Sequence, residues 1–195
     1  MAIARRKLSY PPLGQRMSVE EFLKLPEFKP YLELFEGVVT QKVSPKLPHG
    51  RLQLDLGARI DQFGRPRRIG LAFSEARVIY AGSVVVPDLV VYRWERIPRS
   101  PGGALAEDAS IPPDIIVEIL SPGQSLRALR ERCQWYVEQG TPTALLVNPR
   151  TETINVFGPD TPMPVLRGAD RIDLDAVLPG FQLTVQELFD TLHVD

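Results

Sequence analysis

The sequence has very few residues that bind soft metals or form covalent cross-links: one cysteine and two histidines among 195 residues. The single thiol, Cys133, excludes a disulfide within the chain and any cysteine-rich zinc site. With only His49 and His193 available, a zinc site built from several histidines of one chain is not expected either. These absences narrow the metal chemistry that the chain can support.

Long apolar runs are also absent. No stretch of about 18 apolar residues occurs, so no membrane span is expected. The basic start, Met1 to Lys7, lacks the apolar segment of a secretory signal, and we therefore expect a cytoplasmic protein. The net charge of -1 argues against a wholly basic nucleic-acid-binding surface, while local patches stay open. Composition and length are typical of a globular protein. We expect an N-terminal arm (residues 1–17) followed by one domain (residues 18–195).

Two acidic residues stand inside apolar, β-branched runs. Asp88 follows Val84-Val85-Val86-Pro87, and Glu118 follows Ile115-Ile116-Val117. Short runs of this kind, bounded by Pro, Gly or Ser, are typical of buried strands. An ionised carboxylate is costly to bury unless a cation compensates it. Two such acids on neighbouring strands indicate a bound divalent metal ion.

The order of the predicted elements indicates an α/β fold. Hydrophobic spacing and capping boxes predict helices over residues 18–25, 49–64, 125–139 and 184–192, and strands over 31–35, 38–43, 69–80, 84–92, 115–120, 144–147 and 153–157. The strand–helix–strand unit over 115–147 predicts two parallel strands. With an antiparallel set earlier in the chain, the result is a mixed central sheet with helices on both sides. Asp88 and Glu118 then lie on adjacent strands.

Several motifs, in order, resemble the PD-(D/E)xK signature of the restriction-endonuclease-like superfamily, and most closely a small bacterial family described as "putative restriction endonucleases". The motifs are Leu32-Glu33-Leu34-Phe35-Glu36-Gly37, Ser44-Pro45 through His49, Pro87-Asp88-Leu89-Val90-Val91, Val117-Glu118-Ile119-Leu120-Ser121-Pro122, Leu145-Leu146-Val147-Asn148-Pro149, and Leu178-Pro179-Gly180-Phe181 with Glu187-Leu188-Phe189. Each motif is weak alone, but their order from about Ser18 to Phe189 is specific. The resemblance implies a restriction-endonuclease-like fold and an endonuclease that hydrolyses DNA, expected to act as a homodimer.

The resemblance also implies roles for individual residues. Asp88 and Glu118 correspond to acids that bind Mg²⁺ or Mn²⁺, with the backbone carbonyl of Ile119 as a further oxygen ligand. Glu33 matches an early glutamate that completes the acidic cluster. The ion would lower the pKa of a bound water and steady the scissile phosphate.

The lysine of the signature is missing. Its strict position is Leu120, and in this family it usually lies on the following helix, at the position of Arg132. Arginine binds phosphate through two hydrogen bonds and stays charged, but it does not readily transfer a proton. The family also often has acids where this chain has Ala128 and Asn148. A catalytically weakened relative that binds nucleic acid or protein is therefore the main alternative function.

Each assignment has a structural alternative. Asp88 could sit in a bulge or at a solvated strand end, and Glu118 could simply form a buried ion pair with Arg132. Glu33 could pair across its hairpin, and His49 could cap a helix. A third interpretation is a metal-binding structural module in which the acids serve stability.

Clustered arginines give mild support for a nucleic-acid partner. The candidate DNA-binding residues are Arg65, Arg67, Arg68, Arg127, Arg130 and His49. Phosphate contacts need such clusters and would weaken with salt. Solvated arginine-rich faces are equally common, however, and no sequence-reading module is visible.

Overall fold

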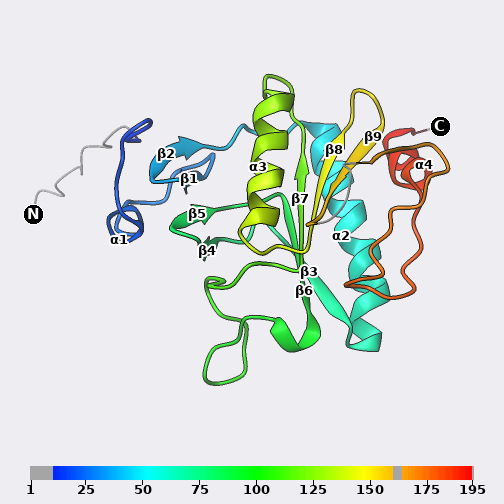
Figure 1. The fold of residues 1–195 in the computed structure, drawn as a ribbon, viewed down its shortest axis with the longest axis horizontal. Helices are drawn as coiled ribbons and strands as arrows, with labels where there is room; N and C mark the ends of the chain where they lie inside the picture. Colours follow the sequence, from blue (N-terminus) through cyan, green and yellow to red (C-terminus); the bar gives the residue numbers. More distant parts are fainter. Residues whose placement is uncertain (1–10, 160–163, 195) are drawn as a thin grey trace, which may run out of the picture.

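The computed structural model describes residues 11–159 and 164–194 (Figure 1). Its elements, in chain order, are α1 (Val19–Phe22), β1 (Leu32–Phe35), β2 (Val38–Gln41), α2 (Leu47–Arg67), β3 (Gly70–Ser74), β4 (Val78–Tyr80), β5 (Ser83–Val85), β6 (Leu89–Arg93), η1 (Trp94–Arg96), β7 (Ile115–Ile119), α3 (Leu126–Glu138), β8 (Thr143–Asn148), β9 (Thr153–Phe157), β10 (Val165–Arg167), α4 (Val185–Phe189) and η2 (Asp190–Leu192). The predicted α/β class is confirmed.

The larger sheet has the order β10-β9-β8-β7-β6-β3. Strands β7 and β8 are parallel, as the strand–helix–strand pattern predicts, and the other pairs are antiparallel. Strand β6 pairs directly with β7, with Leu89 opposite Val117, so Asp88, which immediately precedes β6, lies beside the strand that carries Glu118. The mixed character of the sheet is therefore confirmed.

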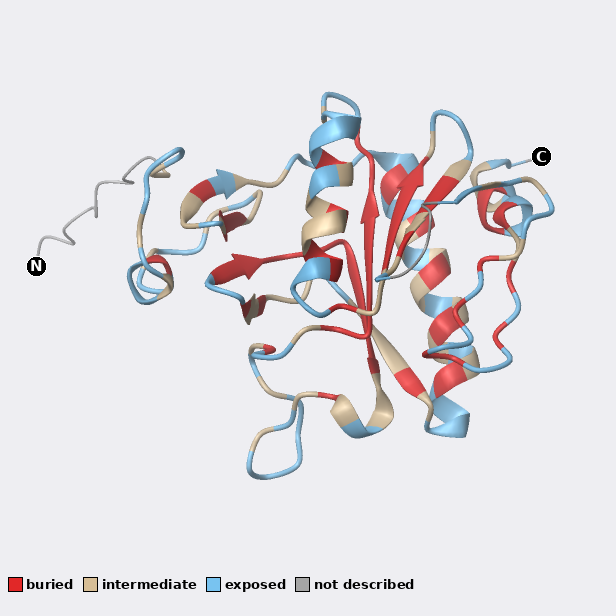
Figure 2. Cartoon of the chain, in the orientation of Figure 1, coloured by how far each residue is buried: buried red, intermediate tan, exposed pale blue. Residues whose placement is uncertain are grey.

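Alternating residues of β6 and β7 face two different helices. Val117 and Ile119 pack with Leu56 and Ile60 of α2, whereas Ile116 packs with α3. Side chains alternate between the two faces of a strand, so Glu118 shares the α3 side with Ile116. Figure 1 shows the two helices on opposite sides of the sheet, and Figure 2 shows its central strands almost entirely buried.

Two predicted strands each prove to be two shorter ones. Residues 69–80 divide into β3 and β4, and residues 84–92 divide into β5 and β6, with each half in a different sheet. The first break falls where Glu75 adopts a positive φ of 49°. The second falls at Pro87, which has no N–H to offer a sheet ladder. Asp88 therefore lies in a bend just before β6, and not inside a strand.

The smaller sheet has the order β2-β1-β5-β4 and packs its own apolar cluster around Leu34. Its hairpin turns at Glu36 and Gly37, whose φ values of 48° and 76° match the predicted turn. The predicted N-terminal arm lies partly outside the described residues. Within its described part, the backbone of Arg16 forms an isolated antiparallel β-bridge with Val38 of β2.

The predicted helices are confirmed with small shifts at their ends. Ser18 and Thr184 form the two predicted capping boxes. The first helix ends at Phe22, and the last ends at Phe189 before a 3-10 turn to Leu192. Helix α2 extends three residues beyond Gly64. In the part of the chain that the structure describes, no helix is long and apolar enough to cross a membrane.

Candidate active site

Three buried carboxylates lie where the two sheets meet. Glu33 comes from β1 of the smaller sheet, Asp88 from the bend before β6, and Glu118 from β7 of the larger sheet. Their exposed fractions are 3%, 3% and 5%. Burial of three acids requires cationic or hydrogen-bonding partners, and the structure provides both.

Both oxygens of Asp88 have partners. Lys42 donates to Oδ1 at 2.6 Å, and Nε2 of His49 lies 3.3 Å from the same oxygen. The backbone N–H of Ile119 donates to Oδ2 at 2.7 Å. Burial raises the pKa of Asp88, but the His49 hydrogen bond and the Lys42 charge outweigh it and lower this pKa to about 2. Asp88 is therefore a fixed carboxylate beside Glu118.

Arg132 joins the other two acids. Its Nη2 donates to Oε1 of Glu33 at 2.5 Å, and its Nε lies 3.2 Å from Oε1 of Glu118. The same Nε donates to the hydroxyl of Tyr136 at 2.6 Å, and that hydroxyl donates to Glu118 at 2.7 Å. The helical spacing placed Arg132 within reach of the strand ends, and its side chain does extend to the buried acids.

Glu118 is less well compensated than Asp88. Burial raises its pKa and the Asp88 charge raises it further, while Arg132 lowers it, and the result is a pKa of about 7. Three carboxylates face two permanent cations, Lys42 and Arg132. Neighbouring carboxylates also hold the pKa of Lys42 above its ordinary value, although burial alone would lower it. The carboxylates therefore outnumber the permanent cations, and the site favours the binding of additional positive charge.

The backbone of Val86 links the two halves of the site. Its N–H donates to Oε1 of Glu33 at 2.7 Å, and its carbonyl accepts from Lys42 at 2.7 Å. Val86 follows β5, and Pro87 after it keeps the chain out of a sheet ladder. The break between β5 and β6 therefore frees the backbone groups that hold Glu33 and Lys42 in place.

The donor chemistry suits a hard divalent cation. Asp88 and Glu118 offer carboxylate oxygens. Burial raises the pKa of Glu118, so additional positive charge nearby would stabilise its ionised form. Within residues 11–159 and 164–194, no group of three His, Cys, Asp or Glu side chains is arranged to hold an ion. Mg²⁺ commonly uses only one or two carboxylates and completes its shell with water and substrate phosphate, so the pair fits such an ion.

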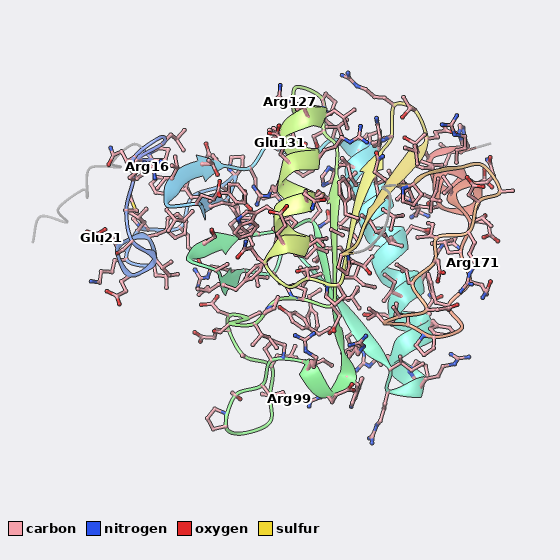
Figure 3. The ribbon with its side chains drawn as sticks, viewed as in Figure 1. Arg16, Glu21, Arg99, Arg127, Glu131 and Arg171 are labelled. Carbon is pink, nitrogen blue, oxygen red and sulfur yellow. The ribbon has the colours of Figure 1, made fainter. Side chains whose placement is uncertain are left out.

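The remaining predicted residues are placed differently. His49 is buried at the start of α2, where Nδ1 lies 2.9 Å from the hydroxyl of Ser121, so its ring lies inside the fold beside Asp88 and not on the surface. Arg127 pairs with Glu131 on the outer side of α3 (Figure 3). The candidates Arg65, Arg67 and Arg68 lie at the opposite end of α2 from His49, about 24 Å away at 1.5 Å per residue. These arginines stay predictions as DNA contacts.

Lys42 and Tyr136 were not among the residues predicted for the site. Lys42 meets Asp88 across 46 positions of the chain. A contact at that separation has no local pattern in a sequence. Tyr136 lies on the apolar face of α3, where its spacing indicates a core residue, and its ring is indeed buried. The only available signal was the position of Tyr136 one helical turn after Arg132.

Comparison with known proteins places the chain in a family. The family Uma2, described as "Putative restriction endonuclease", matches residues 19–186, and the chain belongs to it. Among solved structures, a crystal structure of a "putative nuclease belonging to DUF820" from Anabaena variabilis ATCC 29413 is similar, with 32% identity and a TM-score of 0.87. The match covers 91% of this chain and 99% of that one. No curated protein matches.

The restriction-endonuclease-like fold implied by the sequence motifs is thereby confirmed. The chain is a nuclease-like protein, and nucleases of this fold generally use divalent metal ions.

Proposed function

We propose that the protein is a divalent-metal-dependent endonuclease that hydrolyses phosphodiester bonds in DNA. One observation carries the proposal: the N–H of Ile119 donates to Asp88 Oδ2 at 2.7 Å. Because Ile119 directly follows Glu118 in β7, this bond holds the Asp88 carboxylate close to Glu118. Family membership supports the same reaction class. Asp88 and Glu118 would hold Mg²⁺ or Mn²⁺, with the Ile119 carbonyl as a further candidate ligand.

The residues of the site have distinct roles in this proposal. A bound divalent ion would supply a water nucleophile of lowered pKa and an electrophile for the phosphate. His49 and Lys42 keep Asp88 ionised and oriented. Tyr136 and Arg132 orient Glu118 through the contacts at Oε1. Glu33 holds Arg132 from the far side, so it acts on the site through that guanidinium.

The test is cleavage of supercoiled plasmid and linear duplex DNA in Mg²⁺ or Mn²⁺. We expect Asp88→Asn and Glu118→Gln to cut at least about 100-fold more slowly than wild type, because each removes a charged ligand. Glu131→Gln is the matched control, since Glu131 is an exposed acid on α3. Equal rates in all four proteins would contradict the proposal.

The catalytically weakened alternative predicts a different result. Wild type would bind DNA without cutting it, and Arg132→Lys would gain cleavage by restoring the residue usual at that position. This alternative has a specific observation in its favour, because Arg132 is engaged with Glu33, Tyr136 and Glu118. We further propose that residues 18–195 form one domain. We also propose that the active form is a homodimer, and light scattering of the purified protein would test this oligomeric state.

A further inference from the structure

Lys42 follows the last residue of β2 and points its ammonium group at Asp88. Its Nζ donates to Asp88 Oδ1 at 2.6 Å and to the Val86 carbonyl at 2.7 Å. An ammonium group has three N–H donors. Among the described residues these two oxygens are its hydrogen-bond acceptors, which leaves one donor for a ligand. Lys42 is therefore a fixed cation with remaining bonding capacity beside the acid proposed to bind metal.

The surface groove that reaches Asp88 is lined by Lys42. Lys29, Tyr31, Lys42, His49, Glu75 and Asp88 are among the residues that form this groove. Arg132 lines a separate groove with Phe35 and Trp135, and that groove does not include Asp88. Glu118 lines neither of the two grooves. A phosphate that approaches Asp88 from the first groove therefore meets the ammonium of Lys42 and not the guanidinium of Arg132.

Arg132 is already committed to internal contacts. It bonds Glu33 and the Tyr136 hydroxyl, and its guanidinium lies 5.1 Å from the centre of the Phe35 ring. Movement toward a phosphate would break the ion pair with Glu33 and leave a buried carboxylate unpaired. Arg132 is thus suited to holding Glu33 and Glu118 in place.

We propose that Lys42 supplies the missing lysine of the active site, from the position just after β2 instead of from α3. Its free N–H binds a non-bridging oxygen of the scissile phosphate, where its charge stabilises the developing negative charge. Lys42 is then a catalytic residue, and Arg132 is a positioning residue. The inference rests on the proposed function, because it assumes that a phosphodiester occupies the groove.

DNA affinity provides a test that does not depend on cleavage. We would measure the dissociation constant of a short duplex against salt concentration, with Ca²⁺ in place of Mg²⁺ so that binding is followed apart from cutting. Loss of one phosphate contact reduces the magnitude of the slope of log Kd against log[salt] by about 0.9. We expect this decrease for Lys42→Met and for Lys42→Gln. The glutamine keeps N–H donors for Asp88 and Val86, so it guards against a misfolded methionine variant.

Lys24→Met is the control, because Lys24 is an exposed lysine after α1. Its substitution removes the same charge at a position away from the groove. Its slope should equal that of wild type. A wild-type slope in both Lys42 variants would overturn the inference, as would a wild type that fails to bind DNA. If wild type binds DNA but never cuts it, a reduced slope in the Lys42 variants would support the Lys42 contact and reject the endonuclease function.

Cleavage gives the second readout if the wild type is active. Removal of one such donor lowers kcat by about 100-fold to 1,000-fold, and we expect this for Lys42→Met with a smaller change in KM. Added ethylammonium should restore part of the rate of a Lys42→Ala variant, because truncation to alanine leaves room for a small cation at the position of the lysine ammonium. A purely structural role for Lys42 would not be rescued in this way. A kcat equal to that of Lys24→Met would overturn the inference.

Discussion

Arg132 of α3 donates a 2.5 Å hydrogen bond to Glu33 of β1, across 99 positions of the chain. This contact joins the smaller sheet to the helix that covers the larger one. Glu33 is buried and also accepts the Val86 N–H, so its carboxylate satisfies two donors from different parts of the fold. The acid is therefore expected to serve both the site and the stability of the chain.

Glu33→Ala should lower the free energy of unfolding by about 3 kcal/mol. Removal of Glu33 leaves the buried Arg132 with Glu118 as its one remaining carboxylate partner among the described residues, and it also leaves the Val86 N–H without its acceptor. Urea denaturation followed by circular dichroism measures the change. Glu131→Ala breaks an exposed ion pair on α3 and should hardly move the midpoint. Equal midpoints for the two variants would show that Glu33 is not a structural partner of Arg132.

The stability of the metal-free protein should decrease as pH rises from 6 to 8. Glu118 has an ordinary pKa of 4.5 and a pKa of about 7 when buried in the fold. The folded state therefore binds more protons than the unfolded state between these values, so deprotonation through pH 7 destabilises the fold. About 1 kcal/mol should be lost between pH 6 and 8.

Urea denaturation of wild type and Glu118→Gln at the two pH values measures this effect. The glutamine cannot ionise, so the difference in stability between the two proteins should change with pH in the direction just given. Parallel pH profiles for the two proteins would contradict a raised pKa at Glu118.

Much of this arrangement was accessible from the sequence. The short β-branched runs predict that Asp88 and Glu118 lie on adjacent strands. Strands β6 and β7 do pair, although Asp88 itself lies in the bend just before β6. Arg132 was placed near the acids by helical spacing together with the family motifs. These are local patterns, which strand and helix geometry convert directly into neighbouring positions.

The division into two sheets and the position of Lys42 beside Asp88 were not predicted. An apolar run shows where strands form but not which sheet each half joins, and the switch occurs at Glu75 and Pro87. Proline at 87 was the readable signal, since it cannot donate to a ladder. The contact between Lys42 and Asp88 depends on how the two sheets meet, which is a property of tertiary packing alone.

Mg²⁺ should stabilise the protein more at pH 8 than at pH 6. A proton on Glu118 competes with the ion, and its pKa of about 7 places this competition between the two pH values. The shift in thermal midpoint on addition of Mg²⁺, compared with EDTA, measures binding to the folded state. Asp88→Asn and Glu118→Gln should both abolish the shift. A shift that persists in both variants would place the ion elsewhere.

Gly64→Ala should destabilise the fold although alanine favours helices. Gly64 lies in α2, and a Cβ there would be 2.5 Å from the carbonyl oxygen of Gly70 in β3. Neither backbone can yield easily, because α2 packs on the sheet at this point, so overpacking should cost about 1–3 kcal/mol. Gly50→Ala is the matched control: it lies in the same helix, a Cβ there meets nothing within 4 Å, and it should stabilise by about 0.5–1 kcal/mol. Opposite signs in urea denaturation support this close approach of α2 and β3, and stabilisation by both substitutions would exclude it.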